Sequence, residues 1–371
     1  MSKLRLLHTA DVHLDKPFGW LGSRGGEQRS QLKATFRAVV DLALAERVDV
    51  VLIAGDLFDS NWPSQDTVDL VRAQILRLGV PVFILPGTHD CLDDGSIYRK
   101  VAIAGPDAPN VHVFESEHTA IAVGPLDLTV HGRANTTRSS AASPLKGLNR
   151  SASTRYNVAL AHGSLLMPGT LDDYPIAPSD LSAAAMDYVA LGHWHTYRDC
   201  PTPRGKACYS GPPELLAEGE QGYALVVDID DSGTTVQQRP VGRRKYAQMS
   251  VPLDSARGAE EIRERLRGLR DPDLVLRVVL TGLRPLDLVV DPTELSRDLS
   301  DTFFSVRIAD QSHPMLRPED LEAFAENLVI GQFIRRMGAL VGQSQTEEER
   351  RVRETALQVG VALLQGKKVL Q

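Results

Sequence analysis

The sequence predicts an α/β fold with a parallel sheet whose strands end at a ligand site. Early in the chain, short apolar runs alternate with stretches of helical spacing, and this β-α-β-α-β order implies parallel strands. The run from Val48 to Ala54 is almost wholly apolar, as in a strand covered on both faces. It ends at Gly55-Asp56, and open α/β sheets bind ligands at the carboxyl ends of their strands.

Apolar runs predict the strands of the first half, and apolar residues at helical spacing predict the helices between them. Pro63 suits the first turn of a helix, where a missing backbone N–H leaves no bond unmade. The predicted elements are strand 4–10, helix 27–47, strand 48–54, helix 63–78, strand 80–85, a less regular strand-rich section over 111–131, and strands 156–161 and 188–191.

The second half is predicted to close this domain and add two further parts. Asp231-Ser232-Gly233 predicts the turn of a hairpin between strands 223–229 and 234–241. A compact α/β cap is predicted from strand 246–251, helix 259–269, strand 274–280 and strand 303–308. Apolar residues at helical spacing follow from Leu321 to Val341, and again over 347–364. We therefore predict a first domain over 1–242, a cap over 243–312, and a C-terminal helical segment over 313–371 that offers a docking surface to a partner.

Composition indicates an ordinary globular protein. The 371 residues are 42% apolar, enough for a large core in two or three domains. Three cysteines without metal-site spacing, and a start that lacks the apolar core of a signal peptide, predict a cytoplasmic location. No apolar run approaches the length of a membrane span, so no membrane association is expected.

The net charge of −7 gives no general attraction to nucleic acid, so local charge is the better guide. A loop predicted over Arg133–Thr154 carries basic residues and no acidic one, and a second basic cluster spans Arg239–Lys245. Two interpretations stay open, namely a solvated surface and a substrate-binding rim. The candidate substrate contacts are Arg133, Arg138, Arg243, Arg244 and Lys245.

Carboxylates and histidines gather at the predicted ends of five strands. Such a mixture suits a divalent metal, and the number of side chains is enough for two ions. In Asp11-x-His13, the two ligands lie on the same side of an extended chain. Asp56 is predicted to bridge two ions roughly 3.5 to 4 Å apart, a spacing at which two metals clamp a phosphate and activate a water. The other candidates are His162, His193 and His195.

The motifs that carry these residues occur in a characteristic order. They are Asp11-x-His13, Gly55-Asp56-x-x-Asp59, Gly87-Thr88-His89-Asp90, Ala161-His162-Gly163 and Gly192-His193-x-His195. In this order they resemble the five motifs of the calcineurin-like metallophosphoesterase superfamily. Within it, the chain looks most like the SbcD-type DNA repair exonucleases and their YhaO branch. The resemblance implies a metallophosphoesterase sandwich, with two central sheets flanked by helices, followed by a small α/β cap and C-terminal helices.

The resemblance also implies roles for individual residues. His89 resembles the family's catalytic histidine, which donates a hydrogen bond or a proton to the phosphate and the leaving group, and Asp59 resembles the carboxylate that orients it. Manganese is the metal usually associated with such nucleases. The implied ligands are Asp11, His13, Asp56 and His195 for the first ion, and Asp56, His162 and His193 for the second.

Thr88 departs from the family pattern, which has Asn at this position. The amide oxygen of Asn reaches the second ion, whereas a Thr hydroxyl is shorter and is a poorer ligand for a hard cation. We therefore expect the second ion to bind more weakly than the first, with Thr88 as a poor ligand.

Together these features predict a metal-dependent nuclease that cleaves DNA during repair. The resemblance implies that it works with a coiled-coil ATPase of the SbcC or YhaN type, and that it forms a homodimer. Two alternatives stay open. One is a phosphodiesterase or phosphatase acting on nucleotides or other small phosphoesters, and the other is a scaffold subunit whose metal site is weakened at Thr88.

Overall fold

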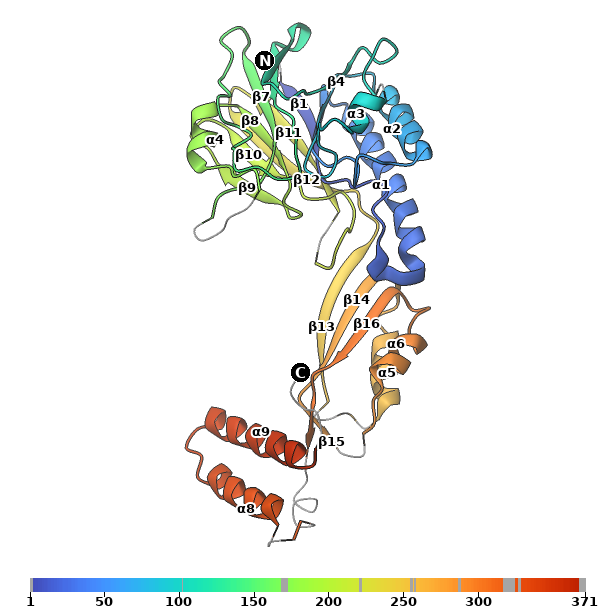
Figure 1. The fold of residues 1–371 in the computed structure, drawn as a ribbon, viewed down its shortest axis with the longest axis vertical. Helices are drawn as coiled ribbons and strands as arrows, with labels where there is room; N and C mark the ends of the chain where they lie inside the picture. Colours follow the sequence, from blue (N-terminus) through green and yellow to red (C-terminus); the bar gives the residue numbers. More distant parts are fainter. Residues whose placement is uncertain are drawn as a thin grey trace. The chain divides into compact units, whose positions relative to one another are not determined.

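The computed structural model describes residues 3–101, 103–167, 173–219, 222–253, 256, 258–285, 288–315, 324–325 and 328–366 (Figure 1). The chain divides into two compact units, Met1–Lys245 and Tyr246–Gln371. The predicted boundaries after residues 242 and 312 stay predictions, and Leu321 lies outside the described residues. None of the described helices is long and apolar enough to cross a lipid bilayer.

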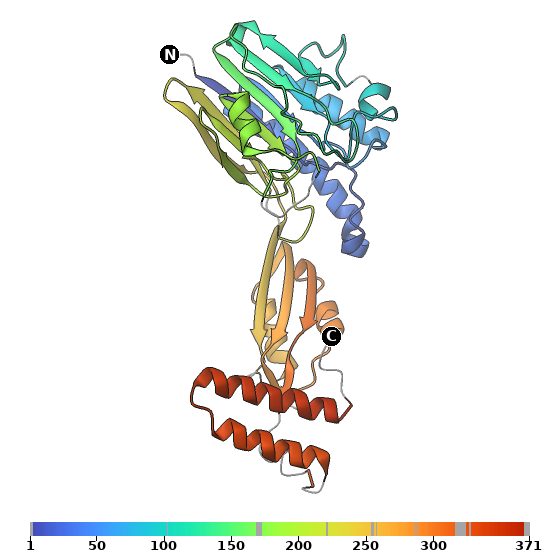
Figure 2. The ribbon, with the colours of Figure 1, turned by 60° about the vertical axis from the view of Figure 1, so that its left-hand side comes forward.

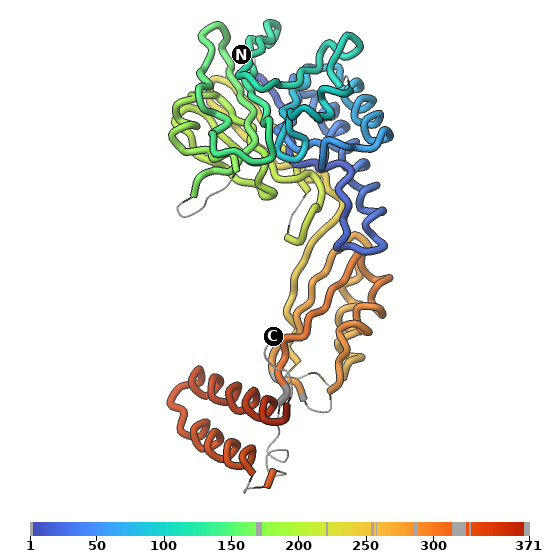
Figure 3. The backbone as a smooth tube through the Cα atoms, in the orientation of Figure 1, coloured from blue at the N-terminus to red at the C-terminus, as the bar shows by residue number. Residues whose placement is uncertain are grey.

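The first sheet contains the parallel strands predicted from the start of the chain. Its order is β12-β11-β1-β2-β3-β4, and β1 to β4 run parallel. Strand β11 pairs antiparallel with β1, although the two lie far apart in the sequence, as the colours of the tube in Figure 3 show. The strands are β1 (Leu4–Thr9), β2 (Val50–Ala54), β3 (Val82–Leu85), β4 (Val111–Val113), β11 (Tyr223–Asp230) and β12 (Gly233–Pro240).

The second sheet has the order β5-β6-β7-β8-β10-β9. Strands β6, β7, β8 and β10 are parallel, and an antiparallel strand lies at each edge. Its members are β5 (Thr119–Val123), β6 (Leu128–Gly132), β7 (Tyr156–His162), β8 (Tyr188–Gly192), β9 (Arg198–Pro201) and β10 (Lys206–Tyr209). The fold class is therefore confirmed, because two mixed sheets are flanked by helices.

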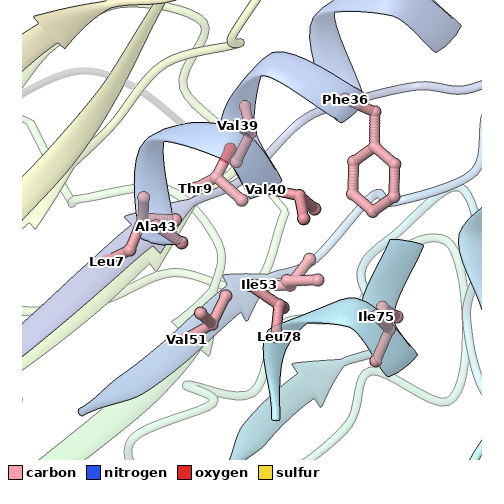
Figure 4. A pocket seen from close by; sticks show the side chains of 10 residues that line it. All are labelled: Leu7, Thr9, Phe36, Val39, Val40, Ala43, Val51, Ile53, Ile75 and Leu78. Atoms are coloured by element: carbon pink, nitrogen blue, oxygen red, sulfur yellow. The ribbon is translucent and has the colours of Figure 1, made fainter. Parts of the chain in front are cut away.

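Burial on both faces explains the apolar run of β2. Leu52 and Ala54 belong to a core shared by residues of both sheets, together with Leu6 of β1. The alternate residues Val51 and Ile53 face the helices α1 (Gly25–Glu46) and α2 (Gln65–Leu78), where Figure 4 shows them around a small apolar cavity. Removing this surface from water on both sides stabilises the strand that precedes Asp56.

The remaining helices of the first unit are short. Helix α4 (Pro178–Ala184) packs on the outer face of the second sheet through Leu181 and Ala184. The sequence did not predict it, because a seven-residue segment with one internal Leu carries little helical periodicity. The others are η1 (Gly19–Arg24), α3 (Ile97–Lys100) and η2 (Gly124–Leu126).

The second unit contains the predicted small sheet and helices. Strand β14 (Asp271–Thr281) lies between β13 (Lys245–Pro252) and β16 (Phe303–Asp310), and β15 (Leu283–Pro285) pairs with β17 (His313–Met315). Helices α5 (Ala259–Arg267) and α6 (Pro292–Asp298) share one apolar core with the three-stranded sheet. Helices α8 (Val329–Gly342) and α9 (Glu347–Leu364) lie side by side in Figure 2 and pack through Ile334, Leu357 and Val361.

Candidate metal centre

The candidate ligands lie where strands of both sheets end. Backbone hydrogen bonds from Asp11 N to the Gly55 carbonyl (3.1 Å) and from His13 N to the Asp56 carbonyl (3.0 Å) fix the loops after β1 and β2 against each other. The first sheet supplies Asp11, His13, Asp56, Thr88 and His89, and the second supplies His162, His193 and His195.

Asp56 lies between two buried histidines. Its Oδ2 is 3.6 Å from Nε2 of His13 and 3.3 Å from Nε2 of His162. On either side of it, the potential donor atoms of Asp11, His13 and His195 lie within 4.8 Å of one another, as do those of Asp11, Asp56 and His162. The position of Asp56 is the one expected of a carboxylate that bridges two ions.

The orientation of both histidines fits a metal. Nδ1 of His162 donates to the Ala54 carbonyl at 2.9 Å, and Nδ1 of His13 bonds the Asp59 carboxylate at 3.0 Å. Each Nε2 is buried and has no hydrogen-bond partner among the described residues. An imidazole held through one nitrogen, with the other directed at a carboxylate, is the usual arrangement of a metal ligand. The residues present therefore fit a divalent cation at this position.

The electrostatics of the same side chains point in the same direction. Burial lowers the pKa of His162, but the adjacent Asp56 carboxylate more than offsets this and raises it to about 9. Burial raises the pKa of Asp56, yet His162 and His13 bring it below its usual range. Asp56 is therefore ionised, and a cation can take the place of the proton that His162 otherwise holds beside it.

His193 and Thr88 lie next to this group. The backbone N–H of His193 donates to both carboxylate oxygens of Asp11, at 3.0 and 3.1 Å, and its ring centroid is 5.2 Å from that of His162. Thr88 donates its hydroxyl to Oδ2 of Asp56 at 3.2 Å. The Thr88 oxygen thus contacts the shared carboxylate directly.

The backbone around the ligands is unusual. Asp11, His13, Asp56 and His193 all have positive φ, at 54°, 49°, 52° and 102°. Non-glycine residues in this region are strained and persist only where surrounding contacts hold them. Gly55 has φ +93°, and a Cβ added there would lie 2.0 Å from Nδ1 of His162. Only glycine therefore lets the β2 loop approach the His162 ring.

His89 lies on the solvent side of these ligands, with 47% of its side chain exposed. Its Nδ1 donates to the backbone carbonyl of Asp59 at 3.0 Å and is 3.8 Å from the carboxylate. That carboxylate lies closer to His13, at 3.0 Å, and to Lys16, at 3.4 Å. Asp59 thus positions His89 through its main chain and His13 through its side chain, whereas the sequence predicted only a carboxylate contact to His89.

Asp90 is a supporting residue to which the sequence assigned no role. Its carboxylate accepts hydrogen bonds from the N–H groups of Gly87 (2.7 Å) and Phe58 (3.1 Å) and from the Tyr98 hydroxyl (2.7 Å). Asp90 therefore joins the loops that follow β2 and β3. Its place directly after His89 in the motif was the available signal, although its partners could not be read from spacing.

The predicted substrate contacts lie outside the ligand clusters. Arg133 is half-buried and donates to the Lys146 carbonyl at 2.7 Å, and Arg138, Arg243 and Lys245 are exposed. Arg244 differs from these, because it is only 5% exposed and its guanidinium contacts Gln28 and Glu27 at 3.3 and 3.5 Å. These contacts fix Arg244 against α1.

The comparison with known proteins agrees with this geometry. A family model described as Calcineurin-like phosphoesterase matches residues 4–197, which include every candidate ligand. The chain belongs to the calcineurin-like phosphoesterase family. The predicted family resemblance is confirmed, and this phosphoesterase carries candidate ligand groups for a metal at the expected strand ends.

Three relatives narrow the comparison. This phosphoesterase is 30% identical over 312 residues to the DNA double-strand break repair protein Mre11 of Aeropyrum pernix, covering 76% of this chain and 74% of that one. It is 29% identical over 314 residues to the uncharacterized metallophosphoesterase YhaO of Bacillus subtilis, covering 79% and 75%. With a subunit of the nuclease SbcCD of the same organism it shares 27% over 265 residues, covering 62% and 66%.

Proposed function

We propose that this phosphoesterase is a metal-dependent nuclease that hydrolyses phosphodiester bonds in DNA. The observation that carries the proposal is Asp56, ionised and buried between the inward-facing Nε2 atoms of His13 and His162. The names of two relatives, a double-strand break repair protein and a nuclease subunit, support DNA as the substrate and repair as the setting.

The proposed ligands divide into two sets that share Asp56. Asp11, His13, Asp56 and His195 would hold the first ion, and Asp56, His162 and His193, with Thr88 as a poor ligand, would hold the second. Two divalent ions, manganese in this proposal, supply neutralisation of phosphate charge and activation of water when bound. Buried carboxylate and imidazole at the strand ends give the hard-oxygen and nitrogen donors that such ions require.

His89 would act on the substrate itself. Its Nδ1 is engaged by the Asp59 carbonyl, so Nε2 is the nitrogen presented to a phosphate above the ligands. From there it can hydrogen-bond a phosphate oxygen and transfer a proton to the departing sugar oxygen. The exposed position of the ring is suited to this role, because a polymeric substrate has to reach it from solvent.

The remaining parts of the proposal concern binding and location. The exposed Arg138, Arg243 and Lys245 and the half-buried Arg133 are proposed to contact DNA phosphates, and the buried Arg244 is left out of that surface. Exposed apolar residues on α8 and α9 support docking of an SbcC- or YhaN-type ATPase. A homodimer and a cytoplasmic location complete the proposal, the latter consistent with three free, buried cysteines.

The test is incubation of the pure protein with manganese and end-labelled duplex DNA, beside bis(p-nitrophenyl) phosphate. We expect cleavage of both, with DNA binding that weakens steeply as salt rises. The Asp56→Asn variant is the control, and it should cleave neither. Hydrolysis of the small diester without DNA cleavage would favour a small-phosphoester enzyme. Cleavage of neither by the wild type with manganese would favour a scaffold.

A further inference from the structure

Trp62 is a large apolar side chain that the metal centre does not use. It follows the second motif by three residues and is 75% exposed. Lys100, at the end of α3, places its Nζ 3.6 Å from the centre of the Trp62 ring. One face of the indole is therefore covered by a cation, while most of the side chain remains open to solvent.

The loop that carries Trp62 is held firmly. The neighbouring Asn61 is buried and donates to the Cys91 carbonyl at 2.8 Å and to the Asp93 carboxylate at 3.2 Å. Its own side-chain oxygen accepts from the N–H of Ile97 at 3.1 Å. The indole thus projects from a backbone fixed on both sides, and its exposure is a property of the folded loop.

Trp62 also lies close to the group proposed to act on phosphate. The Asp59 carbonyl that positions His89 is three residues earlier in the same loop. Three residues span at most about 10 Å even when fully extended. That distance equals about three base rises along a DNA strand. A nucleotide chain with its phosphate at His89 therefore has nearby bases within reach of the indole.

We propose that Trp62 and Lys100 form a stacking platform for an unpaired base next to the phosphate that is cleaved. This inference rests on the proposed nuclease function and specifies its substrate, a DNA end that carries unpaired nucleotides. The face of an indole opposite a cation is free to stack on a base, whereas bases inside a duplex are already stacked on both faces. Lys100 adds positive charge for the adjoining phosphate, which offsets the acidic Asp93 and Asp94 of the same segment.

The test compares end-labelled duplexes whose overhangs, 3′ or 5′, carry either thymidines or abasic sugars. Both overhangs present the same phosphates, and only one presents bases. We expect the wild type with manganese to cleave the thymidine overhang roughly tenfold faster. Trp62→Ala should abolish this preference, and Trp62→Phe should keep most of it. The matched control is Leu76→Ala, because Leu76 is an apolar residue 50% exposed on α2.

Hydrolysis of bis(p-nitrophenyl) phosphate separates the two levels of the argument. All variants should hydrolyse it at the wild-type rate, and their melting temperatures should match the wild type. Wild-type protein that hydrolyses this diester but cleaves no DNA would refute the proposed nuclease. Wild-type protein that cleaves both overhangs equally, or a Trp62→Ala variant that keeps the preference, would overturn the platform. A defect of Trp62→Ala seen only with an added partner protein would also overturn it, in favour of a protein contact.

Discussion

The floor and the rim of the metal centre are built in different ways. The floor, which we define as Asp11, His13, Asp56 and His162, is at most 2% exposed. The rim, which we define as His89 and Trp62, has 47% of the His89 side chain and 75% of Trp62 exposed. Floor residues contact one another across two sheets, while rim residues are held by hydrogen bonds within nearby loops.

This difference shows where the chain can vary without losing its fold. Three floor residues have left-handed backbone, which costs roughly 1 kcal/mol or more each and requires a packed sandwich to hold it. The rim carries no comparable cost, because its side chains project from loops fixed by Asn61 and Asp90. Substrate preference can therefore change at the rim while the ligand geometry of the floor remains.

The largest effect is expected from Gly55→Ala, which alters the floor. The new Cβ would lie 2.0 Å from Nδ1 of His162, at a backbone position with φ +93°. We expect a loss of unfolding free energy of more than about 3 kcal/mol, together with loss of manganese binding. Chemical denaturation and calorimetric titration measure the two quantities.

Gly79→Ala provides the matched control for this substitution. Gly79 also has positive φ, at +65°, but nothing lies within 4 Å of its added Cβ. Its cost should be that of backbone strain alone, about 1 to 2 kcal/mol, with manganese binding unchanged. Equal destabilisation by the two substitutions would show that the contact between the β2 loop and His162 does not define the floor.

At the rim, His89→Gln is expected to reduce turnover without disturbing the fold. Loss of a group that donates a proton or hydrogen bond lowers the rate by about 10²- to 10⁴-fold. The side chain is exposed, so the melting temperature and manganese affinity should match the wild type. Steady-state hydrolysis of bis(p-nitrophenyl) phosphate checks the first expectation. A variant that retains full turnover would exclude the proposed role of His89.

A smaller effect is expected where floor and rim meet, at Thr88. Its hydroxyl contacts Oδ2 of Asp56 at 3.2 Å, and Thr88→Asn replaces it with a longer amide oxygen that can reach a cation. We expect manganese affinity at the weaker site to rise by about tenfold. Calorimetry on both proteins tests this, with Thr88→Val as the control that removes the oxygen. Two equally tight sites in the wild type would contradict the premise.

The smallest effect is expected far from both regions, at Asp228. Burial raises the pKa of Asp228, but hydrogen bonds from Arg5 and Lys3 at 2.8 Å bring it below its usual value. A carboxyl with a lowered folded-state pKa stabilises the protein above about pH 4, and this stabilisation disappears as pH falls through the lower value. Asp228→Asn should therefore be less stable by about 1 kcal/mol at pH 7 and equal to the wild type in strong acid. Denaturation across pH measures the difference, and a constant gap would count against the ion pairs.

The sequence predicts the floor better than its supporting contacts. The apolar run before Asp56 correctly indicated a strand covered on both faces, because Val51 and Ile53 meet helices while Leu52 and Ala54 meet the second sheet. Period-two alternation and flanking turns are local properties, so a single stretch of sequence contains them. The ends of these strands then brought the motif residues to one edge of the molecule.

Other features depend on residues distant in the chain and leave no local signal. The burial of Arg244 requires Glu27 and Gln28 of α1, more than two hundred residues earlier. The preference of the Asp59 carboxylate for His13 over His89 depends on distances that differ by less than an ångström. The sequence therefore identified Arg244 as basic and Asp59 as acidic, but it could not tell which groups they contact.

The hydrogen bond from His162 to the Ala54 carbonyl has a consequence for biosynthesis. It joins a strand made early to one completed only after a hundred further residues have been added. A ribosome-bound chain that has reached Asp56 holds only half of the ligands, because the histidines of the other sheet do not yet exist. Metal loading therefore has to await the closure of the sandwich, and an unfinished chain cannot cut the nucleic acids around it.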